Sequence, residues 1–264
     1  MKVSQASISP RPLLEVQGVS VRFGGIVALD NVSFDIAPRN IVGLIGPNGA
    51  GKTTLFNCIS RLYDCHSGQI LLDGSSLLEK PAHQAAVAGI GRTFQNVALF
   101  RSMSVMDNVL LGRHSRTHSG FLSCAIRLPS VVREEQASMA KVHDLIALLD
   151  LESVADRRVS DLPFGTQKRV ELGRALASEP SLLLLDEPAC GLNHEEVAVL
   201  GGLIRVIRDR LGLTILLVEH HMSLVMSVSD KVVALNFGKK IAQGTPSEVQ
   251  EHPEVVRAYL GSGV

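Results

Sequence analysis

The chain has 264 residues, which suits one large domain or one domain with an appended lobe, and it can bury a core without disulfides. Hydrophobic residues make up 45% and charged residues 20%, as in ordinary globular proteins. The 26 Lys and Arg balance the 26 Asp and Glu, which argues against a nucleic-acid coat or a polybasic membrane anchor. Aromatic residues are only 4%, so the chain has few rings on which bases could stack.

Targeting signals and disulfides are not expected. No apolar stretch approaches the ~20 residues of a membrane span, and the first residues lack the apolar region of a signal peptide. The cysteines form no CxxC pair, so we interpret them as isolated, mostly buried thiols of a reducing compartment and expect no structural zinc site. They are Cys58, Cys65, Cys124 and Cys190.

The chain begins with patterns typical of β-structure. The first segment alternates apolar and polar residues and is interrupted by Gly24-Gly25 and Asp30-Asn31, which predicts short antiparallel strands. Apolar runs then predict two further strands, with a glycine-rich turn and a helix between them. The elements expected in this part are the short strands within 13–37, a strand at Ile41–Ile45, a helix over 52–61 and a strand at 69–72.

The middle of the chain changes character, because helical spacing replaces the β-branched runs. The stretch 112–130, rich in His, Ser, Gly and Arg, is expected to be an exposed linker. We interpret the region as a helical lobe inserted into an α/β core, with the core at residues 1–94 and 179–264 and the lobe at 95–178. The helices expected in the lobe are Val105–Leu111, 131–149 and 167–177.

The last part alternates strands and helices, which predicts a largely parallel sheet. Asn193 is expected to cap a helix, because its side chain can accept from the free N–H groups of the first turn. Two short helices in the tail each begin with proline. The expected elements are strands at 182–185, 213–218 and Lys231–Asn236 and helices at 195–210, Met222–Val228, Pro246–Gln250 and Pro253–Leu260.

A glycine-rich loop between the strand at Ile41–Ile45 and the next helix fits the pattern G-x-x-x-x-G-K-[ST]. Its glycines let backbone N–H groups converge on phosphate oxygens, and the helix presents its positive end to the anion. Lys52 is expected to reach the β- and γ-phosphates, and the Thr53 hydroxyl to coordinate Mg²⁺. A simple glycine turn that caps a helix is the alternative, which the flanking strand and helix disfavour. The expected nucleotide-binding residues are Gly46, Pro47, Asn48, Gly49, Ala50, Gly51, Lys52, Thr53 and Thr54.

The apolar strand at 182–185 ends in two carboxylates, Asp186 and Glu187. A buried parallel strand delivers them to the carboxyl edge of the sheet, beside the glycine-rich loop if the two strands are neighbours. Asp186 is then expected on the Mg²⁺ side, directly or through water, and Glu187 is expected to accept a proton from an attacking water. By itself this ending is typical of a solvated strand end, so the upstream loop is what favours the catalytic interpretation.

The order of these motifs resembles that of the ATP-binding subunits of ABC transporters over residues 13–261. The similarity is closest to the branched-chain amino acid uptake branch, through FGGIVALDNVSF, GPNGAGKTTLFN, RTFQNVALF, LDEPACGLN, VEHHMSLVM and RAYLG. The resemblance implies a P-loop NTPase core with a largely parallel sheet, an N-terminal antiparallel β subdomain near 13–37 and the inserted helical lobe. It also implies an ATPase that uses ATP and Mg²⁺ to power uptake, and only the resemblance indicates the solute.

The resemblance also implies roles for single residues. Phe23 resembles the aromatic residue that stacks on adenine, and a core position is its alternative. Gln95 resembles the glutamine that joins the core to the lobe and senses Mg²⁺ and the membrane partner; a plain surface glutamine is its alternative. His220 resembles the switch histidine that contacts the γ-phosphate. We expect His221 to be incidental, because adjacent histidines on a strand point to opposite faces and rarely bind one metal.

The segment 162–167, LPFGTQ, occupies the place of the family's LSGGQ signature, so Gly165 and Thr166 are expected to bind nucleotide. Pro163 replaces the serine, which removes a hydroxyl and an N–H donor, although proline also suits the first turn of a helix. We therefore expect the nucleotide site that this signature completes, together with the glycine-rich loop of a second subunit, to be weakened but active. Asn193 occupies a position where many members of the family carry aspartate, in the loop that crosses the interface between two ATP-binding subunits. Its alternative role is to cap the following helix.

The assembly implied by the resemblance is a head-to-tail dimer with a second, homologous or identical, ATP-binding subunit. Its expected partners are two transmembrane permease subunits and, indirectly, an external solute-binding protein, with no nucleic acid. The chain is then expected to lie peripherally on the cytoplasmic face of the inner membrane. The alternative is a soluble ABC-type ATPase not coupled to transport, but such proteins usually join two cassettes or carry coiled-coil arms. A nucleotide-binding regulator without turnover is disfavoured by the intact Lys52, Asp186, Glu187 and His220.

Overall fold

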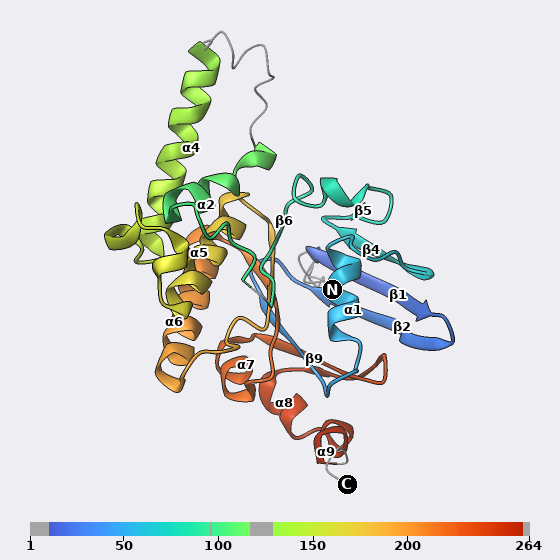
Figure 1. Cartoon of the computed structure of the whole chain (residues 1–264). Helices are drawn as coiled ribbons and strands as arrows, with labels where there is room; N and C mark the ends of the chain where they lie inside the picture. The colour runs from blue at the N-terminus through green and yellow to red at the C-terminus, as the bar shows by residue number, and fades with distance from the viewer. Residues whose placement is uncertain (1–10, 96, 117–128, 261–264) are drawn as a thin grey trace, which may run out of the picture.

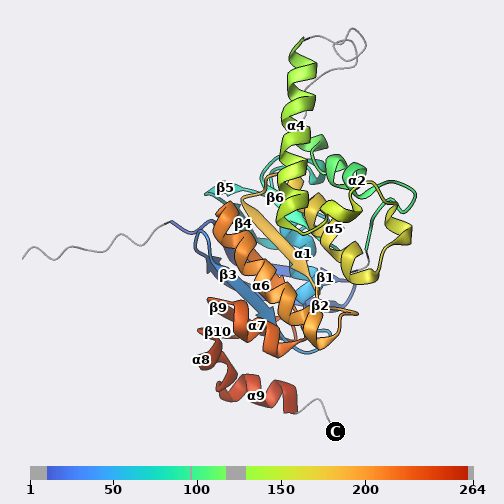
Figure 2. The ribbon, with the colours of Figure 1, turned by 90° about the vertical axis from the view of Figure 1, so that its left-hand side faces the viewer.

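The computed structural model describes residues 11–95, 97–116 and 129–260. Two sheets enclose helix α1 (Lys52–Ile59), and helices α6 (His194–Leu211) and α7 (Met222–Val228) cover the outer face of the larger sheet (Figures 1 and 2). Helices from the middle of the chain gather at one end of the molecule, where the longest of them projects outward (Figure 1). They are α2 (Val105–Leu111), α4 (Pro129–Leu148) and α5 (Phe164–Ala177).

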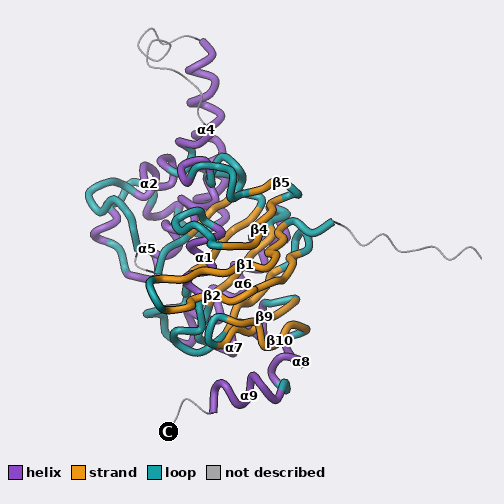
Figure 3. The backbone as a smooth tube through the Cα atoms, turned by 90° about the vertical axis from the view of Figure 1, so that its right-hand side faces the viewer, coloured by secondary structure: helices purple, strands orange, loops and turns teal. Residues whose placement is uncertain are grey.

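The smaller sheet is antiparallel, with the order β2-β1-β4-β5 (Figure 3). Its strands are β1 (Leu14–Phe23), β2 (Ile26–Ile36), β4 (Ser67–Leu72) and β5 (Ser75–Ser76). The prediction of short strands was wrong here, because β1 and β2 have 10 and 11 residues. The break expected at Asp30-Asn31 is a bulge within β2, where Asn31 has φ 52°, donates its N–H to Ser20 Oγ at 3.0 Å, and the register shifts.

The larger sheet has the order β10-β9-β3-β8-β7-β6, and all neighbours are parallel except β10 and β9. This confirms the predicted, largely parallel sheet. The sequence analysis missed two strands of this sheet, β6 and β10, which are its edges, and the two-residue β5 at the edge of the smaller sheet. With a partner on one side only, an edge strand needs no continuous apolar run. The strands are β3 (Ile41–Ile45), β6 (Ile90–Arg92), β7 (Leu182–Asp186), β8 (Thr214–Val218), β9 (Lys231–Asn236) and β10 (Lys239–Gly244).

Most predicted helices are present with small shifts at their ends. Helix α1 ends before the predicted 61, since Arg61 takes a left-handed φ of 62°. The N-cap role of Asn193 is confirmed, because its side chain accepts from Glu196 N–H in a capping box. Both tail helices begin with proline as predicted. The remaining helical elements are α8 (Pro246–Gln250), α9 (Pro253–Leu260) and short 3-10 turns at Ala82–Gln84, His114–Arg116, Glu152–Val154 and Val159–Asp161.

Strand β7 contributes to two hydrophobic cores. Leu182 and Leu184 face the core between the sheets, together with Phe56 of α1. Leu183 and Leu185 face the opposite core, which joins α6 and α7 to the helices of the middle region. Because both faces of the strand are covered, every residue of β7 is buried, and the strand holds Asp186, its last residue, and the following Glu187 on a rigid element.

The stretch predicted as an exposed linker is in part anchored. Arg116 donates to the carbonyl oxygens of Ser178 and Glu179 at 2.7 and 2.8 Å, and Arg113 pairs with the Glu179 carboxylate at 3.1 Å. Residues 117–128, which include Cys124, lie outside the described residues.

Cys58, Cys65 and Cys190 are free thiols as predicted; Cys58 is buried and Cys65 half-buried, but Cys190 is exposed rather than buried. The neighbouring Cys58 side chain lowers the pKa of the Cys65 thiol. Within the described residues, no helix has the length and hydropathy needed to cross a bilayer.

Candidate active site

Residues 46–51 form the loop between β3 and α1, and their conformation requires glycine at two positions. Gly46 has φ 151°, and a Cβ atom there would lie 2.2 Å from the carbonyl oxygen of Leu235. Gly51 has φ 99°, and a Cβ atom would lie 2.6 Å from the carbonyl oxygen of Ala28. The backbones of β9 and β2 therefore lie against the two ends of the loop and leave no room for a Cβ atom at Gly46 or Gly51. Only glycine fits at these two positions.

Lys52 is the first residue of α1, and its side chain lies inside this loop. Its side chain is buried, and Nζ donates to the carbonyl oxygens of Gly46 at 2.7 Å and Pro47 at 3.0 Å. Burial lowers the pKa of Lys52, while the carboxylates of Glu187 and Asp186 raise it. In helix α1, described in full, no side chain caps the first turn and no acidic residue lies in it, so its N–H groups are available to an anion.

Asp186 is the last residue of β7 and Glu187 follows it, and β7 is separated from β3 by β8 rather than adjacent to it. The condition that these strands be neighbours was therefore not met, yet the parallel arrangement brings their carboxyl ends to one edge of the sheet. Arg92 contacts both Asp186 and two residues at the end of α1, Asn57 and Ser60, so the strand end lies close to the helix that follows the loop.

Asp186 is buried and paired with an arginine that the sequence analysis did not select. Its Oδ2 accepts from Arg92 at 2.9 Å, and the same guanidinium donates to Asn57 Oδ1 at 2.8 Å and Ser60 Oγ at 2.6 Å. Burial raises the pKa of Asp186, and the Arg92 guanidinium opposes this shift. Arg92 thus links the end of β7 to helix α1. Its position just before the TFQ motif is the feature of the sequence from which it could have been selected as a site residue.

Glu187 brings three predicted residues together. Its Oε2 accepts from Gln95 Nε2 at 2.8 Å, and its Oε1 lies 2.7 Å from His220 Nε2. Its backbone has a left-handed φ of 47°, a conformation that costs a non-glycine residue about 1–3 kcal/mol and persists where the surroundings hold it. Segments that follow β6, β7 and β8 therefore place an amide, a carboxylate and an imidazole in one cluster.

A second buried carboxylate, that of Glu219, fixes the loop after β8. It accepts from the N–H groups of Ala189 at 2.6 Å, His220 at 3.0 Å and His221 at 3.3 Å. The premise that both histidines lie on a strand was wrong, because β8 ends at Val218 and His221 is the N-cap of α7. No cluster of three or more His, Cys, Asp or Glu side chains that could hold a metal ion occurs within residues 11–95, 97–116 and 129–260.

Phe23 lies at the tip of β1 and is not a core residue. The residue is 47% exposed, and its ring meets the ring of Tyr63 edge-on, with centroids 5.3 Å apart. Tyr63, in the segment after α1, is 41% exposed. In the first turn of α1, Thr53 is exposed and Thr54 is half-buried.

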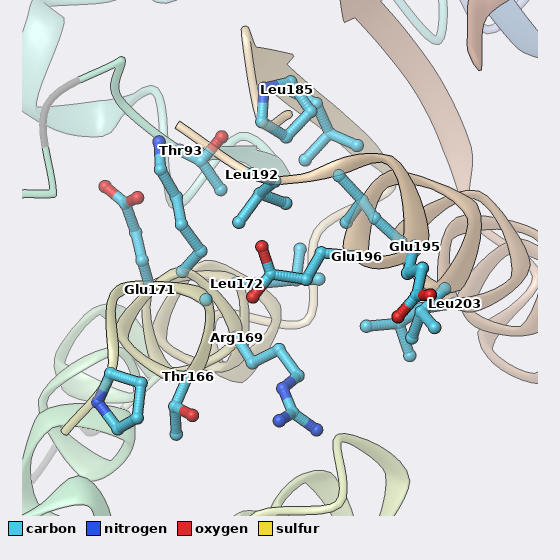
Figure 4. A pocket seen from close by; sticks show the side chains of 16 residues that line it. Thr93, Thr166, Arg169, Glu171, Leu172, Leu185, Leu192, Glu195, Glu196 and Leu203 are labelled. Atoms are coloured by element: carbon cyan, nitrogen blue, oxygen red, sulfur yellow. The ribbon is translucent and has the colours of Figure 1, made fainter. Parts of the chain in front are cut away.

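The signature residues Gly165 and Thr166 lie in the first turn of helix α5, which begins at Phe164. They line a cavity of about 340 Å³ between α5 and α6, where the labelled side chains of Thr166, Arg169 and Glu196 come from facing helices (Figure 4). A Cβ atom on Gly165 would lie 2.9 Å from Glu196 Oε1. Pro163 is exposed and is the N-cap of α5.

Comparisons with known proteins identify the family to which the chain belongs. Residues 29–190 match the ABC transporter family, and residues 239–264 match the family described as branched-chain amino acid ATP-binding cassette transporter. The high-affinity branched-chain amino acid transport ATP-binding protein BraF of Pseudomonas aeruginosa is 41% identical, and LivG of Escherichia coli K12 is 43% identical. Each alignment covers 95% of this chain and 98% of the relative.

Solved structures of ATP-binding cassettes also superimpose on the chain. The ADP conformation of MJ1267, an ATP-binding cassette of an ABC transporter, is 27% identical with a TM-score of 0.82, over 95% of this chain and 99% of that one. A nucleotide-free cassette from an ABC transporter is 28% identical with a TM-score of 0.81, over 94% and 99%. The chain therefore belongs to the ABC transporter family, whose ATP-binding cassettes hydrolyse ATP to power transport.

Proposed function

We propose that this chain is the motor subunit of an uptake transporter for branched-chain amino acids. The observation that carries the motor role is the cluster of Gln95, Glu187 and His220 at the sheet edge that also holds Lys52. The solute class is supported by the identity of 41–43% to BraF and LivG. It is also supported by the match of residues 239–264 to the branched-chain amino acid ATP-binding cassette transporter family.

ATP is held mainly through its phosphates. Backbone N–H groups of residues 46–51 and of the first turn of α1 converge on the phosphate oxygens. The Lys52 ammonium then exchanges the carbonyl oxygens of Gly46 and Pro47 for oxygens of the β- and γ-phosphates. The exposed ring of Phe23 stacks on the adenine.

The donor set suits Mg²⁺, which prefers oxygen ligands. The hydroxyl of Thr53, the amide oxygen of Gln95 and the carboxylate of Asp186 would hold the ion, Asp186 directly or through water. When bound, Mg²⁺ neutralises phosphate charge. The pairing of Asp186 with Arg92 holds its carboxylate in one orientation before nucleotide arrives.

Glu187 accepts the proton of the attacking water. Gln95 and His220 contact its two carboxylate oxygens from different sides, so the group cannot rotate freely. His220 also contacts the γ-phosphate. Because its side chain is about 44% exposed, it can reach the nucleotide without unfolding the loop that Glu219 holds.

A second ATP-binding subunit, homologous or identical, completes each site. Gly165 and Thr166 contact the nucleotide of the partner chain, since they lie against α6 rather than against their own loop. The core at residues 1–94 and 179–264 then binds the chain's own nucleotide. The lobe at 95–178 carries the signature residues to the nucleotide of the second ATP-binding subunit. Lys168 Nζ donates to the Gln95 carbonyl oxygen at 3.0 Å, which links the signature helix to the Gln95 segment.

The complete system contains two transmembrane permease subunits, which dock near Gln95 and the lobe, and an external solute-binding protein. The chain is then peripheral on the cytoplasmic face of the inner membrane. ATP closes the two cassettes, hydrolysis opens them, and the permease subunits follow.

The experiment is uptake of labelled leucine, isoleucine and valine by source cells that lack this chain. Urea and polar amino acids complete the panel, and cells are rescued with wild type or Lys52→Ala. Leucine uptake restored by wild type alone would support both the motor role and the solute class. No loss of uptake for any solute, with the protein in the soluble fraction, would instead favour an ATPase not coupled to transport.

A further inference from the structure

The backbone on both sides of Gln95 is held by a side chain of the signature helix α5. The N–H of Thr93 still follows the sheet and donates to the Leu184 carbonyl oxygen at 3.0 Å. Beyond it, the N–H groups of Phe94 and Ala98 both donate to Glu171 Oε1, at 3.2 and 3.5 Å. Where the sheet ends, a buried carboxylate of α5 therefore takes over as the hydrogen-bond partner.

Glu171 lies in a row of charged side chains along α5. Lys168 precedes it by three residues and Arg174 follows it by three, so the side chains are neighbours on the helix surface. Lys168 Nζ donates to the Gln95 carbonyl oxygen at 3.0 Å, and Arg174 donates to the Ala98 carbonyl oxygen at 2.5 Å. The row thus binds both N–H and carbonyl groups, and every one of these contacts goes to the backbone.

The Glu171 carboxylate is costly to bury. Only 2% of the residue is exposed, and Figure 4 shows its side chain extending from α5. Burial raises the pKa of Glu171, whereas the Phe94 N–H, the Lys168 ammonium, the Ala98 N–H and the Arg174 guanidinium oppose this shift. An apolar residue would avoid the burial of charge but would leave two N–H groups without their acceptor. The role of Glu171 therefore follows from the backbone that it holds.

Gln95 is fixed from two directions. Its carbonyl oxygen is bound to Lys168, and its side-chain amide donates to Glu187 Oε2 at 2.8 Å. A backbone displacement of about 1 Å away from Glu187 would take that contact beyond hydrogen-bonding distance. The support from α5 therefore decides whether the amide reaches the carboxylate.

We propose that Glu171 is a positioning residue for Gln95. It holds the N–H groups of Phe94 and Ala98, and through them the backbone from which the Gln95 amide reaches Glu187. It also joins that backbone to the helix whose first turn carries the signature. The inference rests on the proposed function, since it assumes that Gln95 and Glu187 act together in ATP hydrolysis.

The test compares Glu171→Met, which keeps the length of the side chain and removes its acceptors, with Glu171→Gln, which keeps the shape and one acceptor. Val170→Ala, buried in the hydrophobic core on the same helix, is the matched control for lost packing. Both Glu171 changes are also combined with Gln95→Ala. The ATPase reaction of the assembled transporter gives kcat and KM, and the Tm of each chain is measured.

Glu171→Met is expected to lower kcat about 10- to 150-fold, the equivalent of a hydrogen bond to a charged group, and by no more than Gln95→Ala does. The KM for ATP should stay unchanged, because the phosphate-binding loop is intact. Glu171→Gln should lose less, since its amide oxygen accepts from the same N–H groups. In the Gln95→Ala background, Glu171→Met should have little further effect, because the amide through which it acts is already absent.

An unchanged kcat in Glu171→Met would overturn the inference, as would an equal loss in Val170→Ala. A loss of the same size with and without the Gln95 side chain would make Glu171 a structural residue and would also overturn it. The same holds for a wild-type rate in Gln95→Ala, since Gln95 would then need no positioning. Wild-type turnover by Lys52→Ala, by contrast, would refute the proposed function itself.

Discussion

Glu187→Gln is expected to stop ATP hydrolysis while ATP binding persists. The carboxylate is mostly buried, with one oxygen 2.8 Å from Gln95 Nε2 and the other 2.7 Å from His220 Nε2. A glutamine has the same shape, so its amide oxygen can accept from Gln95 and its NH₂ can donate to a neutral His220. The resting geometry is therefore retained, but an amide cannot accept the proton of the attacking water.

The expected size of the effect follows from the role of a general base. Loss of a positioned base lowers the rate ~10²–10⁴-fold, which corresponds to about 2.7–5.5 kcal/mol in the activation barrier. The loss should appear in kcat with little change in KM, because the contacts of the ground state remain.

The assay is phosphate release by the assembled transporter, with ATP binding and dimer formation measured in parallel. Glu152→Gln is the matched control, since it makes the same chemical change at an exposed site in a 3-10 turn, and it should hydrolyse ATP like wild type. A Glu187→Gln rate within about threefold of wild type would remove Glu187 from the proton transfer. Loss of ATP binding together with the rate would instead make it a structural residue.

Three further changes test other parts of the site. Phe23→Ala should raise the KM for ATP with little change in kcat, because stacking contributes equally to ground and transition states, and an unaltered KM would contradict adenine stacking. Pro163→Ser restores a hydroxyl donor to the signature and should raise the ATPase rate of the complex, by no more than the ~10²–10³ that one preorganised donor supplies; an unchanged rate counts against a weakened site. Arg92→Met should lower the free energy of unfolding by about 3–5 kcal/mol, since the buried Asp186 loses its partner. Adding Asp186→Asn should recover most of that loss, and equal thermal denaturation of the single and double variants would refute the reasoning.

The sequence by itself determined those parts of the protein that depend on neighbouring residues. The spacing of Gly46, Gly51 and Lys52 predicted a glycine-rich loop between an apolar strand and a helix, which the structure has between β3 and α1. The run that ends in Asp186 and Glu187 specified a buried strand with carboxylates at its end. Asn193 was identified as a helix cap from its own side-chain chemistry. In each case the physical cause is local, because backbone conformation and burial follow from the residues a few positions away.

Only the tertiary structure decided which side chains meet. Gln95, Glu187 and His220 converge because the sheet order places β6, β7 and β8 side by side, and no local pattern encodes strand order. The pairing of Asp186 with its buried partner Arg92 depends on the same long-range packing. The edge strands β6 and β10 escaped prediction because a strand paired on one side needs no apolar run. Local periodicity reports burial, whereas contacts between distant segments are fixed only when the sheets and helices pack together.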